Sequence, residues 1–145
     1  MKNTLRLLLV FLPFLGILDA GYLTWQHYGN IIAPCPVHFA FVDCGQVLHS
    51  QYSILFGIPL ALLGVIFYCI ETSIAICVFI TKRAAGKLLL LLFSLGGFLF
   101  SLYLVYIQLF LIKAICLYCI GSAAISTVYF VIVLAYFLRQ KAAVV

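Results

Sequence analysis

Acidic residues are nearly absent from this 145-residue chain, which contains only three: Asp19, Asp43 and Glu71. Charged residues of both signs make up 8% of the sequence, whereas 68% of it is hydrophobic. A soluble domain of this length needs many more charges to cover its surface. The composition therefore excludes a soluble globular protein and indicates that a lipid bilayer is the solvent for most of the chain.

The chain also lacks any continuous run of basic residues, although its net charge is +5. In other proteins such a charge predicts nucleic-acid binding. Here the Lys and Arg residues stand between apolar stretches, as the cytoplasmic loop residues of membrane proteins do. We therefore expect membrane lipid around the protein and no nucleic-acid partner.

Four apolar stretches are each long enough to cross the hydrocarbon core, which takes about 20 residues of helix. The second begins at Pro59, which suits a first helical turn because its missing N–H needs no partner there. The predicted spans are residues 7–23, 59–80, 88–112 and 116–138. The sequence thus predicts an all-α membrane protein of one domain, residues 1–145, with a bundle of four transmembrane helices.

The basic residues predict the orientation of this bundle. Only Lys113 would lie on the outer side. The other seven flank the opposite side: Lys2, Arg6, Lys82, Arg83, Lys87, Arg139 and Lys141. The positive-inside rule makes that side cytoplasmic, so both termini are expected inside and the loop at residues 25–58 outside.

The start of the chain has a second interpretation. Lys2 and Arg6 before an apolar run also resemble a secretory signal peptide. The candidate cleavage position after Ala20 has Leu18 three residues before it, where a small residue is required. We therefore expect the first helix to remain in the protein.

The long outer loop contains both rigid and amphipathic segments. Pro34 and Pro36 stiffen the chain around Cys35, because each proline restricts its own φ and the residue before it. Residues 46–56 mix apolar with polar side chains, which predicts a short amphipathic helix lying in the membrane interface, and Gly57 would end it. The loop is expected to form a lid over the outer end of the bundle.

Cys116 and Cys119 form a Cys-x-x-Cys pair at the start of the fourth span. Such a dithiol exchanges two electrons by closing to a disulfide, and a helix N-terminus favours the reactive thiolate. The alternative is two cysteines that serve as small hydrophobic residues. We predict a redox pair, because both cysteines lie at the outer membrane surface, where disulfides persist.

Two further cysteines, Cys35 and Cys44, lie in the outer loop. Alone they fit a static structural disulfide, whereas beside a Cys-x-x-Cys pair they fit a shuttle that relays electrons. A zinc site is not expected, because these two cysteines are nine residues apart and no histidine pair has ligand spacing. Cys69 and Cys77, inside the second span, are interpreted as small buried apolar residues.

Several polar residues leave their roles open. Glu71 lies deep in the second span, where an ionisable group is costly, so it serves either a proton route or a hydrogen bond to a neighbouring helix. Asp19 is expected to bond a nearby helix or loop. The three histidines are expected at the interface or in solvent: His27, His38 and His49.

These features together resemble the vitamin K epoxide reductase family in its short microbial form. The resemblance covers nearly the whole chain and rests on residues 18–19, 22–28, 35, 43–50, 57–59, 63–64 and 116–119. The order of the cysteine pairs supports this resemblance, because here the loop pair comes first and the Cys-x-x-Cys pair second. In the other family of four-helix disulfide-forming oxidases, the Cys-x-x-Cys comes first and the shuttle pair second.

The resemblance implies a quinone-dependent protein-disulfide oxidoreductase that supports disulfide formation in exported proteins. Cys119 resembles the cysteine that faces the quinone, and Cys116 its partner toward the loop. Cys44 resembles the shuttle that exchanges with Cys116, and Cys35 the site that meets the redox partner. Ser50 resembles a loop residue near the active site, and its alternative is an ordinary interfacial serine.

Two positions depart from the vertebrate enzymes, which carry Asn and Tyr where this chain has Leu60 and Ala123. The departure favours ubiquinone or menaquinone over vitamin K epoxide, whose reduction stays an alternative function. Many microbial relatives have a fused thioredoxin-like domain, but this chain ends at Val145. We expect a separate thioredoxin-fold (DsbA-like) partner outside a bacterial or archaeal plasma membrane. A non-enzymatic scaffold with a structural disulfide is the alternative from another class.

Overall fold

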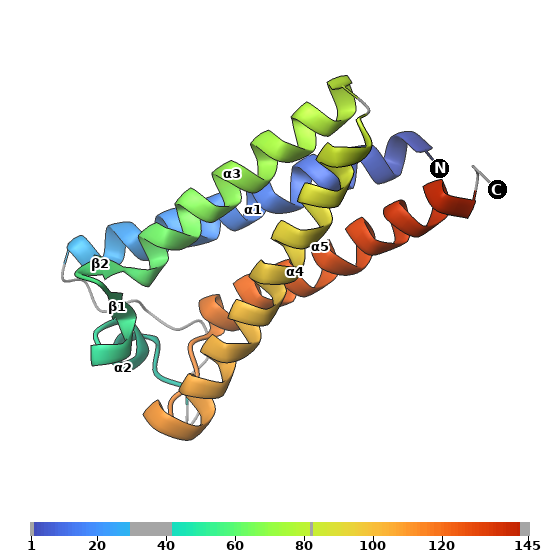
Figure 1. Ribbon diagram of the computed structural model, residues 1–145. Coiled ribbons are helices and arrows are strands. Elements are labelled where there is room, and N and C mark those ends of the chain that lie inside the picture. The colour runs from blue at the N-terminus through green and yellow to red at the C-terminus, as the bar shows by residue number, and fades with distance from the viewer. Residues whose placement is uncertain (1, 30–41, 82, 143–145) are drawn as a thin grey trace.

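The computed structural model describes residues 2–29, 42–81 and 83–142. Within it, four helical spans are long and apolar enough to cross a membrane. They run side by side as a bundle, which confirms the predicted architecture (Figure 1). The helices are α1 (Lys2–Tyr28), α3 (Leu60–Thr81), α4 (Ala84–Tyr106), which η2 (Ile107–Ile112) continues, and α5 (Leu117–Ala142).

The helices extend beyond the predicted spans. The apolar pattern predicts that the first span ends at Leu23, yet α1 continues to Tyr28. The polar residues of this extension are accommodated within the helix. The hydroxyl of Thr24 donates to the carbonyl of Ala20 at 2.7 Å, and Gln26 is buried. Hydropathy therefore detects the membrane-crossing part of a helix and not its full length.

The prediction of one amphipathic helix at residues 46–56 is wrong. A shorter helix, α2 (Cys44–Leu48), is followed by the 3₁₀ turn η1 (Gln51–Ser53). The strands β1 (Ile54–Leu55) and β2 (Ile58–Pro59) then pair antiparallel in a small hairpin. We call residues 42–59 the lid.

Local backbone preferences explain why the long helix does not form. Ser50 is extended, with φ −69° and ψ 157°, which separates α2 from η1. Phe56 and Gly57 both have positive φ, +53° and +81°, as a two-residue hairpin turn requires. Pro59 pairs with Ile54 in the hairpin, so α3 begins one residue later than predicted, at Leu60.

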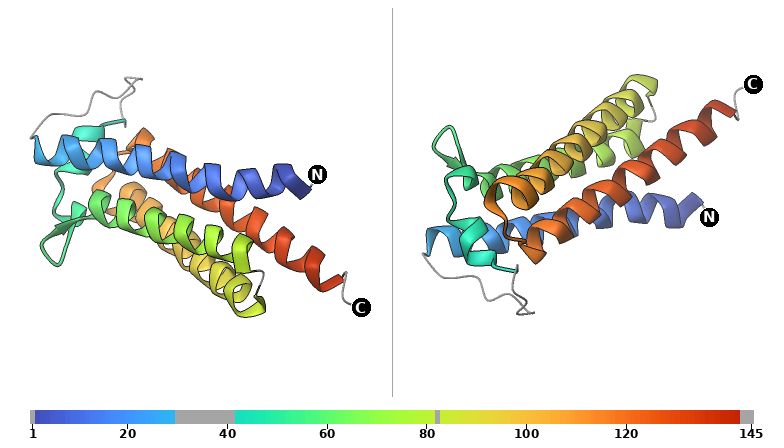
Figure 2. Two further views of the ribbon diagram at one scale, coloured as in Figure 1. Left: turned by 90° about the horizontal axis from the view of Figure 1, so that it is seen from above. Right: turned by 90° about the horizontal axis from the view of Figure 1, so that it is seen from below.

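The lid lies at one end of the bundle and the described ends of the chain lie at the other (Figure 2). The start of α1, the end of α5 and the turn between α3 and α4 share that second end (Figure 1). The turn between η2 and α5, which leads into the Cys-x-x-Cys pair, is on the lid side. The lid and the Cys-x-x-Cys turn therefore meet at the same end of the bundle.

Two glycines let the helices approach closely, as small residues do between membrane helices. A Cβ atom at Gly97 of α4 would clash with the Phe67 ring of α3. A Cβ atom at Gly16 of α1 would lie 2.6 Å from Cζ of the Tyr68 ring. Tyr68 is buried and its hydroxyl is hydrogen-bonded to α5, so this ring cannot move aside easily.

We expect Gly16→Ala to lower the free energy of unfolding by about 1–3 kcal/mol, the usual cost of overpacking a well-packed interior. Gly21→Ala, on the same helix, is the control, because a Cβ there meets nothing within 4 Å. Thermal unfolding of both variants in detergent measures the difference. Equal melting temperatures for Gly16→Ala and wild type would contradict the packing described here.

Candidate active site

The Cys-x-x-Cys pair occupies the N-terminal end of α5. Cys116 directly precedes the helix and is fully buried, whereas Cys119 lies in its first turn. The backbone N–H of Cys119 donates to Cys116 Sγ at 3.3 Å, and the N–H of Ile120 donates to the carbonyl of Cys116 at 3.0 Å. The sulfur of Cys116 thus caps the helix, in the position where a serine or aspartate oxygen often does.

Both cysteines of this pair are free thiols. The pKa of the Cys116 thiol is lowered from its ordinary value, chiefly because the Cys119 side chain hydrogen-bonds to it. Burial opposes this effect, and the backbone N–H groups of Cys119 and Tyr118 reinforce it. A lowered pKa increases the thiolate fraction of Cys116, which is the form that exchanges disulfides.

A reversal of the chain brings Cys116 back against the preceding helix. The π-helix η2 ends at Ile112, and the residue after it, Lys113, has a left-handed conformation with φ +57°. Eight residues after Gln108, the N–H of Cys116 donates to Gln108 Oε1 at 3.0 Å, and this bond is buried. Short π-helical segments are rare and frequently mark functional sites.

The lid holds Cys44 against the same turn. Val42 forms a parallel bridge with Ile115, and the N–H of Asp43 donates to the carbonyl of Ile115 at 3.2 Å. The side chain of Asp43 also caps α2, since its Oδ1 accepts from the N–H of Gln46 at 2.8 Å. Cys44, the first residue of α2, is thereby fixed two residues beyond the bridge.

Cys44 and Cys116 are buried in one apolar cluster, which we call the cysteine cluster. Its buried members are Leu23, Cys44, Val47, Leu48, Ala114 and Cys116, and Cys119 packs against it. Cys44 is disulfide-bonded. The other predicted loop cysteine, Cys35, lies outside the described residues, so its pairing with Cys44 stays a prediction.

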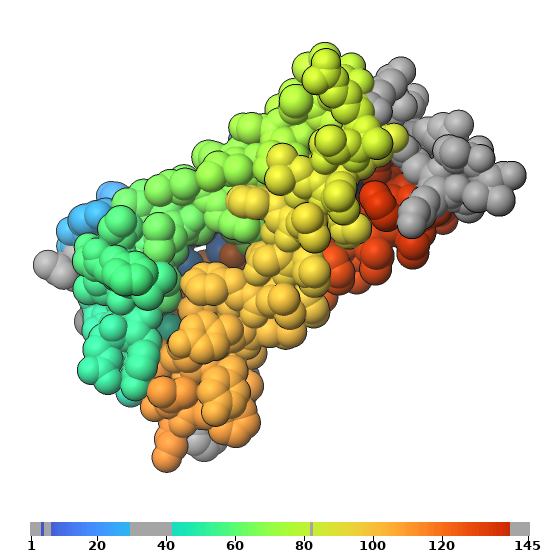
Figure 3. All heavy atoms as spheres, viewed as in Figure 1, coloured from blue at the N-terminus to red at the C-terminus, as the bar shows by residue number. Residues whose placement is uncertain are grey.

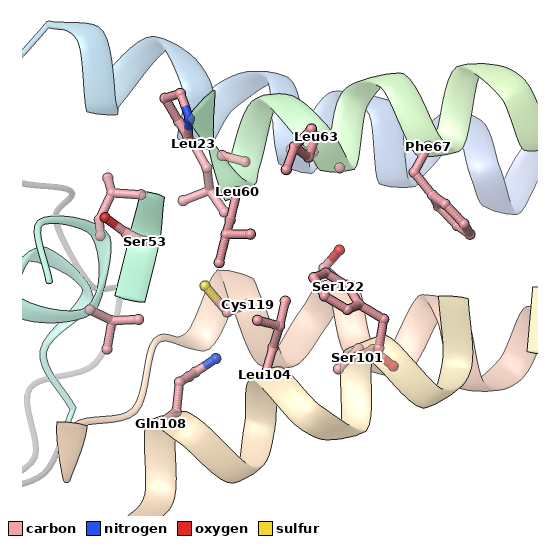
Figure 4. Close-up of a pocket in the computed structure, with 18 of the residues that line it drawn as sticks. Leu23, Ser53, Leu60, Leu63, Phe67, Ser101, Leu104, Gln108, Cys119 and Ser122 are labelled. Atoms are coloured by element: carbon pink, nitrogen blue, oxygen red, sulfur yellow. The ribbon is translucent and has the colours of Figure 1, made fainter. Parts of the chain in front are cut away.

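An apolar cavity of about 430 Å³ lies beneath the lid, between the helices. Cys119 lines it, whereas Cys116 does not (Figure 4). The volume falls in the range of small-molecule sites. In the space-filling view the surface is hollowed between α3 and α4 beside the lid (Figure 3). This hollow faces sideways out of the bundle, in the direction from which a lipid-soluble molecule would enter.

Several polar side chains also line this cavity. The Tyr68 hydroxyl lies 2.9 Å from Ser122 Oγ and 3.0 Å from Ser126 Oγ, and it donates to the Ser122 carbonyl at 3.1 Å. Gln108 lies beside Cys119. Asp19 Oδ2 is buried and makes no hydrogen bond with any residue that the structure describes, so the expected bond from this oxygen is not found.

Other predicted residues lie at the edge of the cavity. Ser50 lines it, and its hydroxyl donates to the carbonyl of Val47 at 2.9 Å. His27 lines it too, with Nδ1 lying 3.1 Å from the Leu48 carbonyl oxygen, and its ring stacks on that of His49. These two histidines connect the end of α1 to the lid, where His27 is half-buried and His49 is exposed. His38 lies outside the described residues.

The residues singled out in α3 differ in their burial. Glu71 is buried, with 1% of its surface exposed. Cys69 and Cys77 are not buried as predicted but exposed on the outside of the bundle. A transmembrane helix shows one face to lipid, and apolar composition alone does not reveal which face.

Within residues 2–29, 42–81 and 83–142, no three His, Cys, Asp or Glu side chains are grouped so that they could hold a metal ion.

Sequence reasoning did not identify Gln108, Tyr68, Ser122 or Ser126 as site residues. One signal was available for part of this set. Cys119, Ser122 and Ser126 recur at helical spacing on α5, which places them on one face. The positions of Gln108 and Tyr68 depend on contacts between helices, which no local pattern contains.

Comparison with known proteins agrees with these features. A sequence model described as the vitamin K epoxide reductase family matches residues 7–134. The chain is also similar to a thiol-disulfide oxidoreductase, LTO1, of Arabidopsis thaliana, with 31% identity over 117 residues. This match covers 76% of the chain but only 31% of the plant protein.

Proposed function

We propose that this chain, which belongs to the vitamin K epoxide reductase family, is a membrane thiol–disulfide oxidoreductase. In this proposal it reoxidises a separate thioredoxin-fold (DsbA-like) protein outside the membrane and passes the electrons to a quinone. It would thereby support disulfide formation in exported proteins. The chain spans about a third of its plant relative's length, so partner and acceptor are proposed on the chemistry of the site.

One observation carries the proposal: the two thiols of the Cys-x-x-Cys pair lie in different surroundings. Cys119 lines the apolar cavity, whereas Cys116 is buried with Cys44 in the cysteine cluster. A relay needs such a division, because one sulfur must meet the electron acceptor and the other must meet the shuttle. A purely structural cysteine pair would need neither the cavity nor the neighbouring disulfide.

The proposed reaction is two successive disulfide exchanges. A thiolate of the partner attacks the proposed Cys35–Cys44 disulfide at Cys35, and Cys44 leaves as a thiolate. The partner's second thiol then attacks this mixed disulfide, which completes the partner's own disulfide and releases Cys35. Cys44 then attacks the oxidised form of the Cys-x-x-Cys pair at Cys116, and Cys119 leaves as a thiolate. Cys35 then closes again on Cys44, which releases Cys116, so that two electrons have moved from the partner to the Cys-x-x-Cys dithiol.

The dithiol returns to a disulfide when it gives up two electrons and two protons, and a quinone accepts both to become a quinol. The cavity suits the apolar ring of such a substrate, and the hollow between α3 and α4 would admit it from the bilayer. Leu60 and Ala123 both line the cavity as apolar residues. They support ubiquinone or menaquinone as acceptor and weigh against vitamin K epoxide.

The test is quinone reduction by the purified protein. With a reduced thioredoxin-fold protein as donor and ubiquinone-1 as acceptor, we expect one quinol for each disulfide formed in the donor. The absorbance of the quinone and thiol titration of the donor measure the two sides. Donor oxidation that continues unchanged without any quinone would contradict this acceptor.

The orientation of the protein follows from its basic residues and gives a separate prediction. Of the eight, the six described residues Lys2, Arg6, Arg83, Lys87, Arg139 and Lys141 belong to chain segments at the end of the bundle opposite the lid, so we propose that this end is cytoplasmic. Reporters fused at Lys87 and at Arg139 are expected in the cytoplasm. A reporter inserted near His38 is expected on the outer side, and a reporter that is exported from Lys87 would contradict the topology.

A further inference from the structure

Gln108 occupies a position between the redox pair and the cavity. Its side chain is almost fully buried, with 4% of its surface exposed, and it lines the cavity together with Cys119. Its carbonyl oxygen, Oε1, accepts the N–H of Cys116 at 3.0 Å. This bond fixes which way the amide group faces, because the oxygen must point toward the Cys-x-x-Cys turn.

The other half of the same amide carries two N–H donors. In Figure 4 the amide nitrogen of Gln108 points into the cavity, on the side of Cys119. Among the described residues, the bond from Cys116 is the hydrogen bond that the Gln108 side chain makes. An amide donor that faces an apolar cavity gains a hydrogen bond when a ligand brings an acceptor, so this nitrogen is suited to such a ligand.

The serine hydroxyl groups around the cavity already have partners within the protein. Ser101, also on α4, donates to the carbonyl of Phe98 at 2.8 Å. Ser122 and Ser126 interact with the Tyr68 hydroxyl. Gln108 differs from them because its donors are directed at the space beside the Cys119 sulfur.

We propose that Gln108 is a substrate-binding residue whose amide nitrogen donates a hydrogen bond to a carbonyl oxygen of the quinone beside Cys119. This inference rests on the proposed function and names a contact within it. The same amide would then join the two reactants, since its oxygen holds the Cys116 backbone and its nitrogen holds the acceptor. As the carbonyl oxygen gains electron density and then a proton, a preplaced donor stabilises the developing charge.

Two substitutions separate the two halves of the amide. Gln108→Leu removes both hydrogen bonds, whereas Gln108→Glu keeps an oxygen for the Cys116 N–H and loses the amide donors. We expect the KM for ubiquinone-1 to rise about tenfold in both variants, the effect of one lost hydrogen bond to a ligand. Only Gln108→Leu should also lower the melting temperature, because only it leaves the Cys116 N–H without an acceptor.

Binding is measured without turnover by repeating both changes in a Cys119→Ala background. Isothermal titration with ubiquinone-1 in lipid nanodiscs should show the same tenfold increase in the dissociation constant. The matched control is Gln26→Leu, which removes a buried glutamine of α1 that does not line the cavity. Its KM and dissociation constant should stay within about twofold of the parent, the range expected for a site without ligand contact.

The outcomes separate this inference from the proposed function. If wild type reduces and binds ubiquinone-1 and both Gln108 variants match it, the inference is wrong and the proposed function stands. If only Gln108→Leu is affected, with a parallel loss of melting temperature, Gln108 acts through Cys116 alone and the inference is again wrong. If wild type neither binds nor reduces any quinone, both fail.

Discussion

Cys119→Ala is expected to abolish quinone reduction while the protein stays folded. Cys119 is the cysteine of the pair that lines the cavity, and a single remaining thiol at Cys116 cannot close to a disulfide. Cys116→Ala should abolish turnover for the second reason alone. Quinone consumption with a reduced thioredoxin-fold donor measures the loss, and the melting temperature shows that the fold is retained.

The matched controls are the two cysteines of α3. Cys69 and Cys77 are free and exposed on the outside of the bundle, so Cys69→Ala and Cys77→Ala should retain wild-type activity. Substantial activity in Cys119→Ala would refute the relay. Loss of activity in a folded Cys69→Ala or Cys77→Ala protein would show that α3 has a redox role that the present scheme omits.

The second large effect is the trapping of a covalent intermediate. Cys44→Ala should accumulate a mixed disulfide between Cys35 and a thioredoxin-fold protein of the outer compartment. The physical reason is that the lone Cys35 thiolate attacks the disulfide of an oxidised partner, and no Cys44 thiol is then present to displace the partner from Cys35. Non-reducing gels followed by mass mapping of the linked peptides identify the species.

The complementary variant should trap the next step. In Cys35→Ala, Cys44 is free to pair with Cys116, which is buried in the same cysteine cluster, and an internal disulfide from lid to helix is expected. A static Cys35–Cys44 staple predicts neither species and only a loss of stability. A partner found on Cys116 and not on Cys35 would overturn the proposed order of exchange.

The fold was largely predictable because membrane solvation acts on each segment separately. An apolar stretch of sufficient length must be helical, since every backbone N–H and carbonyl needs a partner inside the bilayer. The four spans therefore emerge from hydropathy, with α1 and α5 ending later than the apolar pattern indicates. The Cys-x-x-Cys pair at the start of α5 was predictable for the same reason, as it stands at the edge of an apolar run.

The lid was predicted poorly because its residues, unlike those of a membrane span, do not share one solvent environment. Its alternation of apolar and polar residues fits an amphipathic helix as well as the short helix, turn and hairpin that form. Positive φ at Phe56 and Gly57 and the pairing of Ile54 with Pro59 decide between these structures. The local backbone preferences involved are small, so packing against neighbouring elements selects among the possible structures of the lid.

By itself, the sequence determined the membrane class, the four spans and which cysteines are chemically interesting. Only the tertiary structure decided that Cys119 faces the cavity while Cys116 is buried beside Cys44. It also brought Gln108 to the Cys116 backbone and Tyr68 of α3 to the serines of α5. The physical reason is that helix formation depends on neighbours a few residues away, whereas the site depends on how whole helices and the lid pack against one another.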